Sequence, residues 1–186
     1  MMNKGYLTCG RDAESDEVYT PFYAVAPIVK YIPKDWTVWC PFDAEWSAFA
    51  QAFRERGYRT VCSHIGNGQD FFEYTPAEPY DCIVSNPPFS KKDRVLKRLY
   101  ALNKPFAVLL PLNSLQGIGR YAYFKRGLQL LAFDKRIDYH TRGNLTAYMR
   151  GNHFASAYFC RSILPGSLVL EELKKYDRPL IAQEEK

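Results

Sequence analysis

The sequence has no apolar run of about eighteen residues, so we expect no helix that crosses a membrane and no membrane partner. Residues 1–16 are polar and lack the apolar stretch typical of a signal peptide. The five cysteines are scattered without a CxxC pair, which argues against both a disulfide framework and a zinc knuckle. These absences predict a protein of a reducing compartment, which means a cytoplasmic location.

Other distinguishing patterns are missing as well. The three histidines, His64, His140 and His153, lie far apart and share no metal-ligand spacing, so we predict no metal site. No repeat, linker or low-complexity segment divides the chain. The composition is 47 % apolar and 24 % charged, close to the average for soluble globular proteins. We therefore expect one domain over residues 1–186.

Two residue classes are enriched. Phe, Tyr and Trp make up 16 % of the sequence, and the net charge is +5. Basic and aromatic residues alternate in one part of the chain, the basic aromatic segment at 120–152. Such a surface can track phosphates and stack on bases, although a solvated basic face with no partner has the same pattern. The predicted nucleic-acid contacts are Arg120, Lys125, Arg126, Arg142 and Arg150.

Short apolar runs alternate with helical patterns in the first 110 residues, which indicates β-α-β units and a parallel sheet. The predicted strands cover 36–40, 58–64, 80–85 and 105–110, and the predicted helices cover 21–32, 45–56 and 91–102. Thr20 and Asp43 are candidate N-caps for the first two helices. Later strands are expected at 128–133, 136–140 and 153–160, and a short helix at 167–176.

The residues that most directly indicate chemistry are Asn86-Pro87-Pro88-Phe89, which follow a predicted buried strand. The two prolines remove two N–H donors and leave carbonyls without a helix or ladder partner. The Asn86 amide oxygen and the Pro87 carbonyl can accept the two N–H groups of an exocyclic amine, and Phe89 offers a face for a planar base. Ligands of open parallel sheets bind at the carboxyl ends of the strands, where this motif is expected.

This motif resembles that of the S-adenosylmethionine-dependent amino-methyltransferases, in which Asn/Asp-Pro-Pro-Tyr/Phe follows the fourth strand. The likeness covers roughly residues 18–160 and is closest to small phage-type adenine-N6 DNA methyltransferases. It implies an α/β, Rossmann-like class I methyltransferase sheet, mostly parallel with a C-terminal antiparallel strand, and helices on both faces. It also implies S-adenosyl-L-methionine as cofactor, DNA as substrate, and a location in the host cytoplasm if the protein is encoded by a phage.

The resemblance assigns site residues as well. The implied catalytic residues are Asn86, Pro87, Pro88 and Phe89. The implied cofactor-binding residues are Tyr19, Thr20, Pro21, Cys40, Pro41, Asp43, Asp70, Phe71 and Asn86. Within this set, Asp43 corresponds to the acid that meets the methionine amine, and Asp70-Phe71 to the element at the cofactor's adenine. A core position for Tyr19 and a surface or helix-capping position for Asp70 are the alternatives.

Two positions depart from the family pattern. No glycine stands in the turn after the first strand, where the family has a glycine-rich sequence and this chain has Cys40-Pro41-Phe42-Asp43. The second strand ends in Ser63-His64-Ile65 instead of in an acid for the ribose hydroxyls. The target-base motif is therefore complete, whereas the cofactor site is atypical.

The resemblance predicts direct methyl transfer to the exocyclic N6 amine of adenine in DNA, on a flipped or unpaired base. RNA base methylation and protein glutamine-N5 methylation remain alternatives, because the Asn-Pro-Pro motif serves them too. A nucleic-acid-binding protein with this fold and no catalysis is a third, favoured by the missing glycine turn. Too few residues separate the first strand from Asn86 for a target-recognition domain. We therefore expect loose specificity, or a homodimer or partner protein that supplies it.

Overall fold

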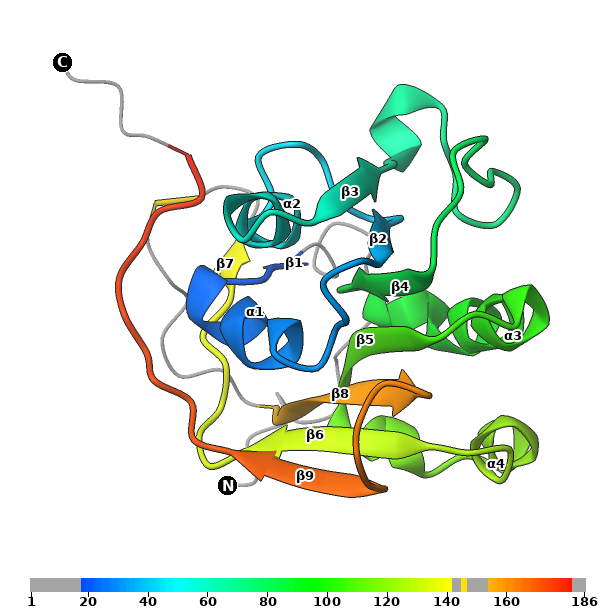
Figure 1. The fold of residues 1–186 in the computed structure, drawn as a ribbon. Coiled ribbons are helices and arrows are strands. Elements are labelled where there is room, and N and C mark those ends of the chain that lie inside the picture. Colours follow the sequence, from blue (N-terminus) through cyan, green and yellow to red (C-terminus); the bar gives the residue numbers. More distant parts are fainter. Residues whose placement is uncertain (1–17, 142–144, 147–153, 182–186) are drawn as a thin grey trace, which may run out of the picture.

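The computed structural model describes residues 18–141, 145–146 and 154–181 (Figure 1). Its main sheet has seven strands in the order β3-β2-β4-β5-β8-β6-β9. The strands are β2 (Thr37–Cys40), β3 (Arg59–Cys62), β4 (Cys82–Ser85), β5 (Phe106–Pro111), β6 (Gln129–Phe133), β8 (Ser156–Arg161) and β9 (Leu168–Glu171). All pairings are parallel except those of β8, which runs antiparallel to both β5 and β6. The mostly parallel sheet with an antiparallel strand near the C-terminus is thus confirmed.

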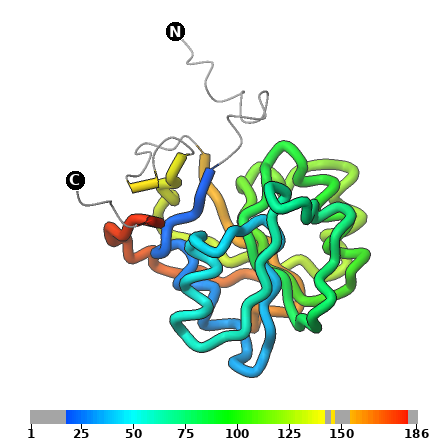
Figure 2. The backbone as a smooth tube through the Cα atoms, turned by 90° about the horizontal axis from the view of Figure 1, so that it is seen from above, coloured from blue at the N-terminus to red at the C-terminus, as the bar shows by residue number. Residues whose placement is uncertain are grey.

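Helices cover both faces of the sheet, as expected. They are α1 (Phe22–Val29), α2 (Ala48–Glu55), α3 (Lys92–Leu102) and α4 (Ile118–Phe124). Figure 1 and the view from above in Figure 2 show α1 and α2 on one face and α3 and α4 on the other. Helix α4 was not predicted; it has seven residues, and none of them is fully buried. None of the helices in the described part of the chain is long and apolar enough to cross a membrane.

A separate two-stranded sheet joins β1 (Val18–Tyr19) to β7 (His140–Thr141) in antiparallel register. The strand predicted at 136–140 is therefore wrong in extent, since only its last residue is in a strand, and that strand belongs to the small sheet. The pairing has a structural consequence. It fixes the backbone just before α1 beside the motif residue Asn86, whose side chain bonds to Val18.

Both predicted helix caps are wrong. Pro21 occupies the N-cap of α1 and makes no side-chain bond, so Thr20 lies one residue too early to act as a cap. Helix α2 begins later than predicted and is capped by Ser47, whose hydroxyl accepts the N–H of Ala50 (3.1 Å). Asp43 and Thr20 are thereby freed for other contacts.

The helix predicted at 167–176 is also wrong. Residues Leu168–Glu171 form β9, an edge strand in which exposed and half-buried side chains alternate. Alternation with a period of two is typical of a strand. A segment of four residues is too short, however, for this pattern to distinguish a strand from a helix. The Glu171 carboxylate ties the edge strand to the end of α1, where it accepts from Lys30 (2.6 Å) and Tyr31 (2.5 Å).

Much of the aromatic enrichment lies in the core. Trp39, Phe49, Phe53 and Tyr158 are almost completely buried between the sheet and the helices. The Tyr158 hydroxyl, buried among them, donates to the carbonyl of Ala24 (2.9 Å), so its burial leaves no donor unpaired. Cys40, Cys82 and Cys160 are small buried side chains in the strands, whereas Cys62 in β3 is half-buried. Burial raises the pKa of Cys82 to about 12. Such a thiol is not a nucleophile at neutral pH.

Candidate active site

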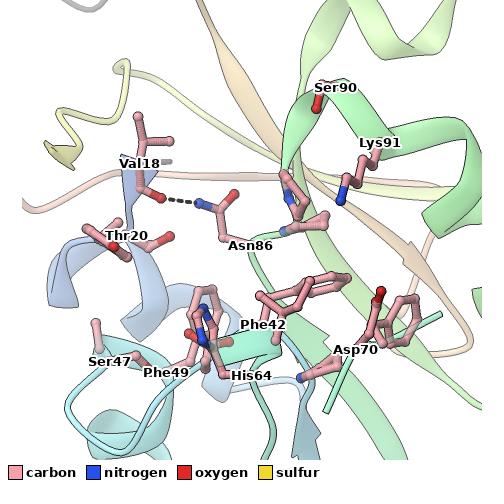
Figure 3. Close-up of a pocket in the computed structure, with 18 of the residues that line it drawn as sticks. Val18, Thr20, Phe42, Ser47, Phe49, His64, Asp70, Asn86, Ser90 and Lys91 are labelled. Atoms are coloured by element: carbon pink, nitrogen blue, oxygen red, sulfur yellow. Dashed lines mark hydrogen bonds between the residues drawn. The ribbon is translucent and has the colours of Figure 1, made fainter. Parts of the chain in front are cut away.

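A cavity of about 230 Å³ lies at the carboxyl ends of β2 and β4, the place where open parallel sheets bind ligands (Figure 3). Its walls come from segments far apart in the sequence. They are Val18–Thr20 before α1, Pro41–Asp43 after β2, Ser47–Phe49 in α2, His64–Ile65 after β3, Asp70–Phe72, Asn86–Pro88, Ser90–Lys91 and Leu180.

Most of the residues predicted from the motifs meet at this cavity. Those in its walls are Tyr19, Thr20, Pro41, Asp43, Asp70, Phe71, Asn86, Pro87 and Pro88. Three others lie elsewhere. Pro21 is buried at the start of α1, and Cys40 is fully buried as the last residue of β2. Phe89 is buried beneath the motif, so the structure does not bring these three side chains to the cavity wall.

The place of Phe89 corrects the expectation that its ring offers a stacking face. The chain turns into a short 3-10 helix at Phe89–Lys91, which directs the ring inward. There it packs edge-on against Phe154 (5.4 Å between centroids) and Tyr139 (6.2 Å). In this structure the phenyl group anchors the motif to the core.

Asn86 has an amide whose orientation is set by a backbone contact. Its Nδ2 donates to the carbonyl oxygen of Val18 (3.0 Å; Figure 3). Because a carbonyl can only accept, this bond assigns the two ends of the amide. Oδ1 is then buried, and no described residue donates to it. An unsatisfied buried acceptor costs about 1–3 kcal/mol, so an N–H donor from a ligand would be favourable there.

Thr20 supplies a second unsatisfied polar atom at the same cavity. The residue is buried, and its Oγ1 has no hydrogen-bond partner among the described residues. Buried hydroxyls are rarely left in this state unless a ligand or water completes them. Thr20 and Asn86 therefore mark the cavity as a site for a polar ligand.

Asp43 is an acid buried in the cavity wall, with only 7 % of its surface exposed. Its carboxylate accepts the hydroxyl of Ser85, the last residue of β4, and also bonds to Ser47. Burial raises the pKa of Asp43 to about 6, while the bonds from Ser85 and Ser47 oppose that rise. An acid perturbed in this way within a cavity is a candidate for binding or catalysis, because a cationic ligand offsets the cost of its charge.

Aromatic rings form the wall opposite Asn86. Phe71 packs against Phe42 (4.8 Å between centroids), and both rings line the cavity. Asp70 accepts the N–H of Phe72 (3.0 Å), which shapes the turn that carries these rings. Asp70 is half-buried in the cavity wall, and its bond to Phe72 is a local capping contact of the kind that the alternative for this residue describes. An apolar slot beside a carboxylate suits a planar heterocycle that bears an amine.

Sequence reasoning missed several wall residues, among them Phe42, Ser47, Lys91 and Leu180. Lys91 follows the motif by two positions and is the first residue of the helix predicted at 91–102. Nothing in the sequence connects Leu180 with a motif more than ninety residues earlier. His64, noted only as a departure, is in the wall, and its Nδ1 accepts the N–H of Gly66 (3.0 Å). Neutral His64 therefore carries its proton on Nε2.

Among the described residues of the basic aromatic segment, the three predicted contacts Arg120, Lys125 and Arg126 are not in the cavity wall. Arg120 is held by Asp93 (2.7 Å) and by the carbonyl of Ser114 (2.7 Å). Arg126 lies over the ring of Tyr100 (5.4 Å), near the start of β5 and thus at the opposite edge of the sheet. Lys125 precedes it at the end of α4 and contacts Tyr121. Arg142 and Arg150 lie outside the described residues, so a nucleic-acid role for this segment remains a prediction.

No protein-family model and no curated protein matches the chain. Among solved structures, the methyltransferase subunit of a type I restriction-modification system from Streptococcus thermophilus is similar, with a TM-score of 0.54 and 12 % identity over 84 % of this chain. The chain has the Rossmann-like methyltransferase fold. It spans only 47 % of that subunit. A second solved structure comes from Listeria monocytogenes and is described as a class I S-adenosylmethionine-dependent methyltransferase. It aligns with a TM-score of 0.47 and 11 % identity, and the alignment covers 83 % of this chain and 65 % of the Listeria chain.

Proposed function

We propose that this protein is an S-adenosylmethionine-dependent methyltransferase that acts on the exocyclic N6 amine of adenine in DNA. The observation that carries the proposal is Asn86 Oδ1. It is a buried acceptor to which no residue of the described part of the chain donates, in the wall of a cavity at the carboxyl edge of a methyltransferase-fold sheet. An exocyclic amine supplies the missing donor and keeps a lone pair for reaction.

The residues of the cavity fit the cofactor. Asp43 would accept the α-ammonium group, which would also offset the cost of ionising a carboxyl whose pKa burial raises to about 6. Asp70 would accept from the amine of the cofactor's adenine, and the Phe71 ring would pack beside that base. The unpartnered hydroxyl of Thr20 offers a further polar contact. When bound, S-adenosylmethionine supplies an electrophilic methyl group on a positively charged sulfur.

The chain's own residues would act mainly by positioning. Asn86 Oδ1 accepts one N–H of the target amine, and the bond from Nδ2 to Val18 keeps the amide from rotating away. The Pro87 carbonyl is the proposed acceptor for the second N–H. With both N–H groups held, the nitrogen lone pair would be left free for the methyl group that the cofactor supplies, and the extra proton of the methylated amine would pass to water. Holding two reactants in this geometry accounts for a large part of the rate gain in such reactions.

DNA is the proposed acceptor for two reasons. The complete Asn-Pro-Pro-Phe motif is closest to that of adenine-N6 DNA methyltransferases, and the similar Streptococcus protein belongs to a restriction-modification system. A base within a duplex is out of reach of a cavity, so the target adenine must be flipped or unpaired.

The test is transfer of a labelled methyl group from S-adenosylmethionine to four acceptors: double-stranded DNA, single-stranded DNA, RNA and a glutamine-containing peptide. Nucleoside analysis of the DNA products identifies the modified atom. Label in N6-methyladenine supports the proposal. Label only in RNA or in the peptide would assign the reaction to those acceptors instead. No label in any acceptor, from folded protein that also fails to bind the cofactor, would favour a binding protein without catalysis.

A further inference from the structure

The start of α3 carries an excess of positive charge beside the cavity. Five basic residues lie within eight positions, and the one acid among them, Asp93, is already paired with Arg120. The basic residues are Lys91, Lys92, Arg94, Lys97 and Arg98. Lys92 and Arg94 are in the first turn of α3, where the helix dipole disfavours cations. This positive charge makes the rim of the cavity attractive to anions.

Three of these residues are exposed, and one of them lines the cavity. Lys91 lines the cavity itself, and its amine lies 5.9 Å from the ring centre of Phe72. The guanidinium of Arg94 lies over the same ring (4.1 Å), yet the residue stays exposed. Lys97 follows Arg94 by three positions and is exposed on the same side of the helix. Together they form a basic strip that leads away from the cavity.

Large apolar side chains are exposed on the neighbouring helix. Ile118 is 100 % exposed and Tyr121 is 68 % exposed, although monomeric soluble proteins rarely place such side chains together in solvent. The Arg120–Asp93 ion pair joins the first turns of α4 and α3. Helix α4, which carries Ile118 and Tyr121, is therefore a neighbour of the first turn of α3.

We propose that these residues form one platform, defined by Lys91, Arg94, Lys97, Ile118 and Tyr121, that binds the single-stranded nucleic acid next to the base in the cavity. The charge is complementary to phosphates, and Lys91 makes the platform continuous with the cavity. Tyr121 offers the exposed ring on which an adjacent unpaired base stacks. This inference rests on the proposed function and deepens it. Lys125 at the end of α4 contacts the Tyr121 ring of this platform (5.8 Å to the ring centre), whereas Arg126 lies over Tyr100 near the opposite edge of the sheet.

The test is the binding of a fluorescein-labelled 12-nucleotide single strand, followed by anisotropy at several salt concentrations without cofactor. The double variant Arg94→Gln/Lys97→Gln removes two phosphate contacts. We expect roughly tenfold weaker binding and a salt slope reduced by about 1.4, since each contact to a single strand contributes about 0.7. The matched control is Lys34→Gln/Lys104→Gln, which removes two exposed lysines outside the platform. The control is expected to bind like the unmodified protein.

The stacking part of the platform is tested separately. Tyr121→Ser is expected to weaken binding of the same strand about tenfold, because base–aromatic stacking is strong and independent of salt. Ile118→Ser is expected to weaken it less. Leu170→Ser is the control, since it removes an equally exposed apolar side chain from the edge strand β9. All of these side chains are exposed, so the melting temperatures of the variants should match that of the unmodified protein.

Methyl transfer to the same oligonucleotide separates failure of the platform from failure of the proposed function. Weaker binding and a raised KM in the platform variants, with controls unaffected, support the platform. If the unmodified protein methylates the strand and the platform variants do so with the same KM, the platform is refuted while the proposed function stands. If the unmodified protein neither binds nor methylates any nucleic acid, both are refuted.

Discussion

Asp43 makes the stability of the protein depend on pH, by an amount that follows from the structure. Burial raises its pKa from 3.8 to about 6, a difference of about two units, and each unit corresponds to about 1.4 kcal/mol. The folded protein holds this proton more tightly than the unfolded chain. Its free energy of unfolding therefore falls by about 3 kcal/mol as the pH rises from about 4 through 6, from this group alone. The neighbouring Cys40 thiol stays neutral throughout, because burial raises its pKa well above the ordinary value.

Asp43→Asn removes the charge and keeps the shape of the side chain. We expect the unliganded variant to be more stable than the unmodified protein at pH 7, by up to about 3 kcal/mol, and to lose the fall in stability between pH 4 and 6. Urea unfolding at several pH values measures this difference. Asp35→Asn, at an exposed aspartate, is the control and should leave the pH profile unchanged.

The same variant is expected to bind S-adenosylmethionine at least tenfold more weakly in calorimetry, because the ammonium group loses its carboxylate. In the unmodified protein, cofactor affinity should rise between pH 5 and 7 as Asp43 ionises. Greater stability together with weaker binding distinguishes a lost ligand contact from misfolding. An Asp43→Asn protein that is no more stable at pH 7, or that binds the cofactor as tightly as before, would refute the reasoning.

Three further predictions concern the cavity and the motif beside it. Thr20→Val removes an unpartnered buried hydroxyl. Differential scanning calorimetry should therefore show the free energy of unfolding unchanged or raised by about 1 kcal/mol, while cofactor affinity falls. A clear loss of stability would mean that the hydroxyl has a partner in the folded protein. Arg178 pairs with Glu55 (3.0 Å) two residues before Leu180, which lines the cavity. Arg178→Glu should therefore weaken cofactor binding, and adding Glu55→Arg should restore it; failure of the double variant to recover would show that the pair does not position Leu180. Phe89→Ala should cost about 3–5 kcal/mol in urea unfolding, as for other buried aromatics, whereas a loss below about 1 kcal/mol would contradict its core position.

The sheet could be predicted because its signals are local. Each central strand is an apolar run between turn residues, and parallel strands covered on both faces need such runs. Because parallel strands run in the same direction, their carboxyl ends lie at the same edge of the sheet. Asp43 after β2 and Asn86 after β4 therefore meet in one cavity, although nothing in the sequence links them directly.

The rest depended on contacts between distant segments. Strand β9 (Leu168–Glu171) forms because an edge of β6 is open to it, which its own sequence does not reveal. The inward turn of Phe89 depends on Phe154 and Tyr139, which belong to the last third of the chain. Leu180 reaches the cavity because the segment after β9 crosses α2, where Gln51 donates to its carbonyl (3.0 Å). Such packing decides which side chains face a ligand, and motif spacing alone does not contain it.

The central claim is that Asn86 holds the amine that receives the methyl group. The most direct measurement compares Asn86→Ala with Asn113→Ala, an exposed asparagine outside the cavity walls, in methyl transfer to DNA and in cofactor binding. We predict that Asn86→Ala lowers the transfer rate roughly 100-fold or more, with cofactor affinity within about twofold, while Asn113→Ala changes neither. Methyl transfer by Asn86→Ala at a rate close to that of the unmodified protein would contradict the account.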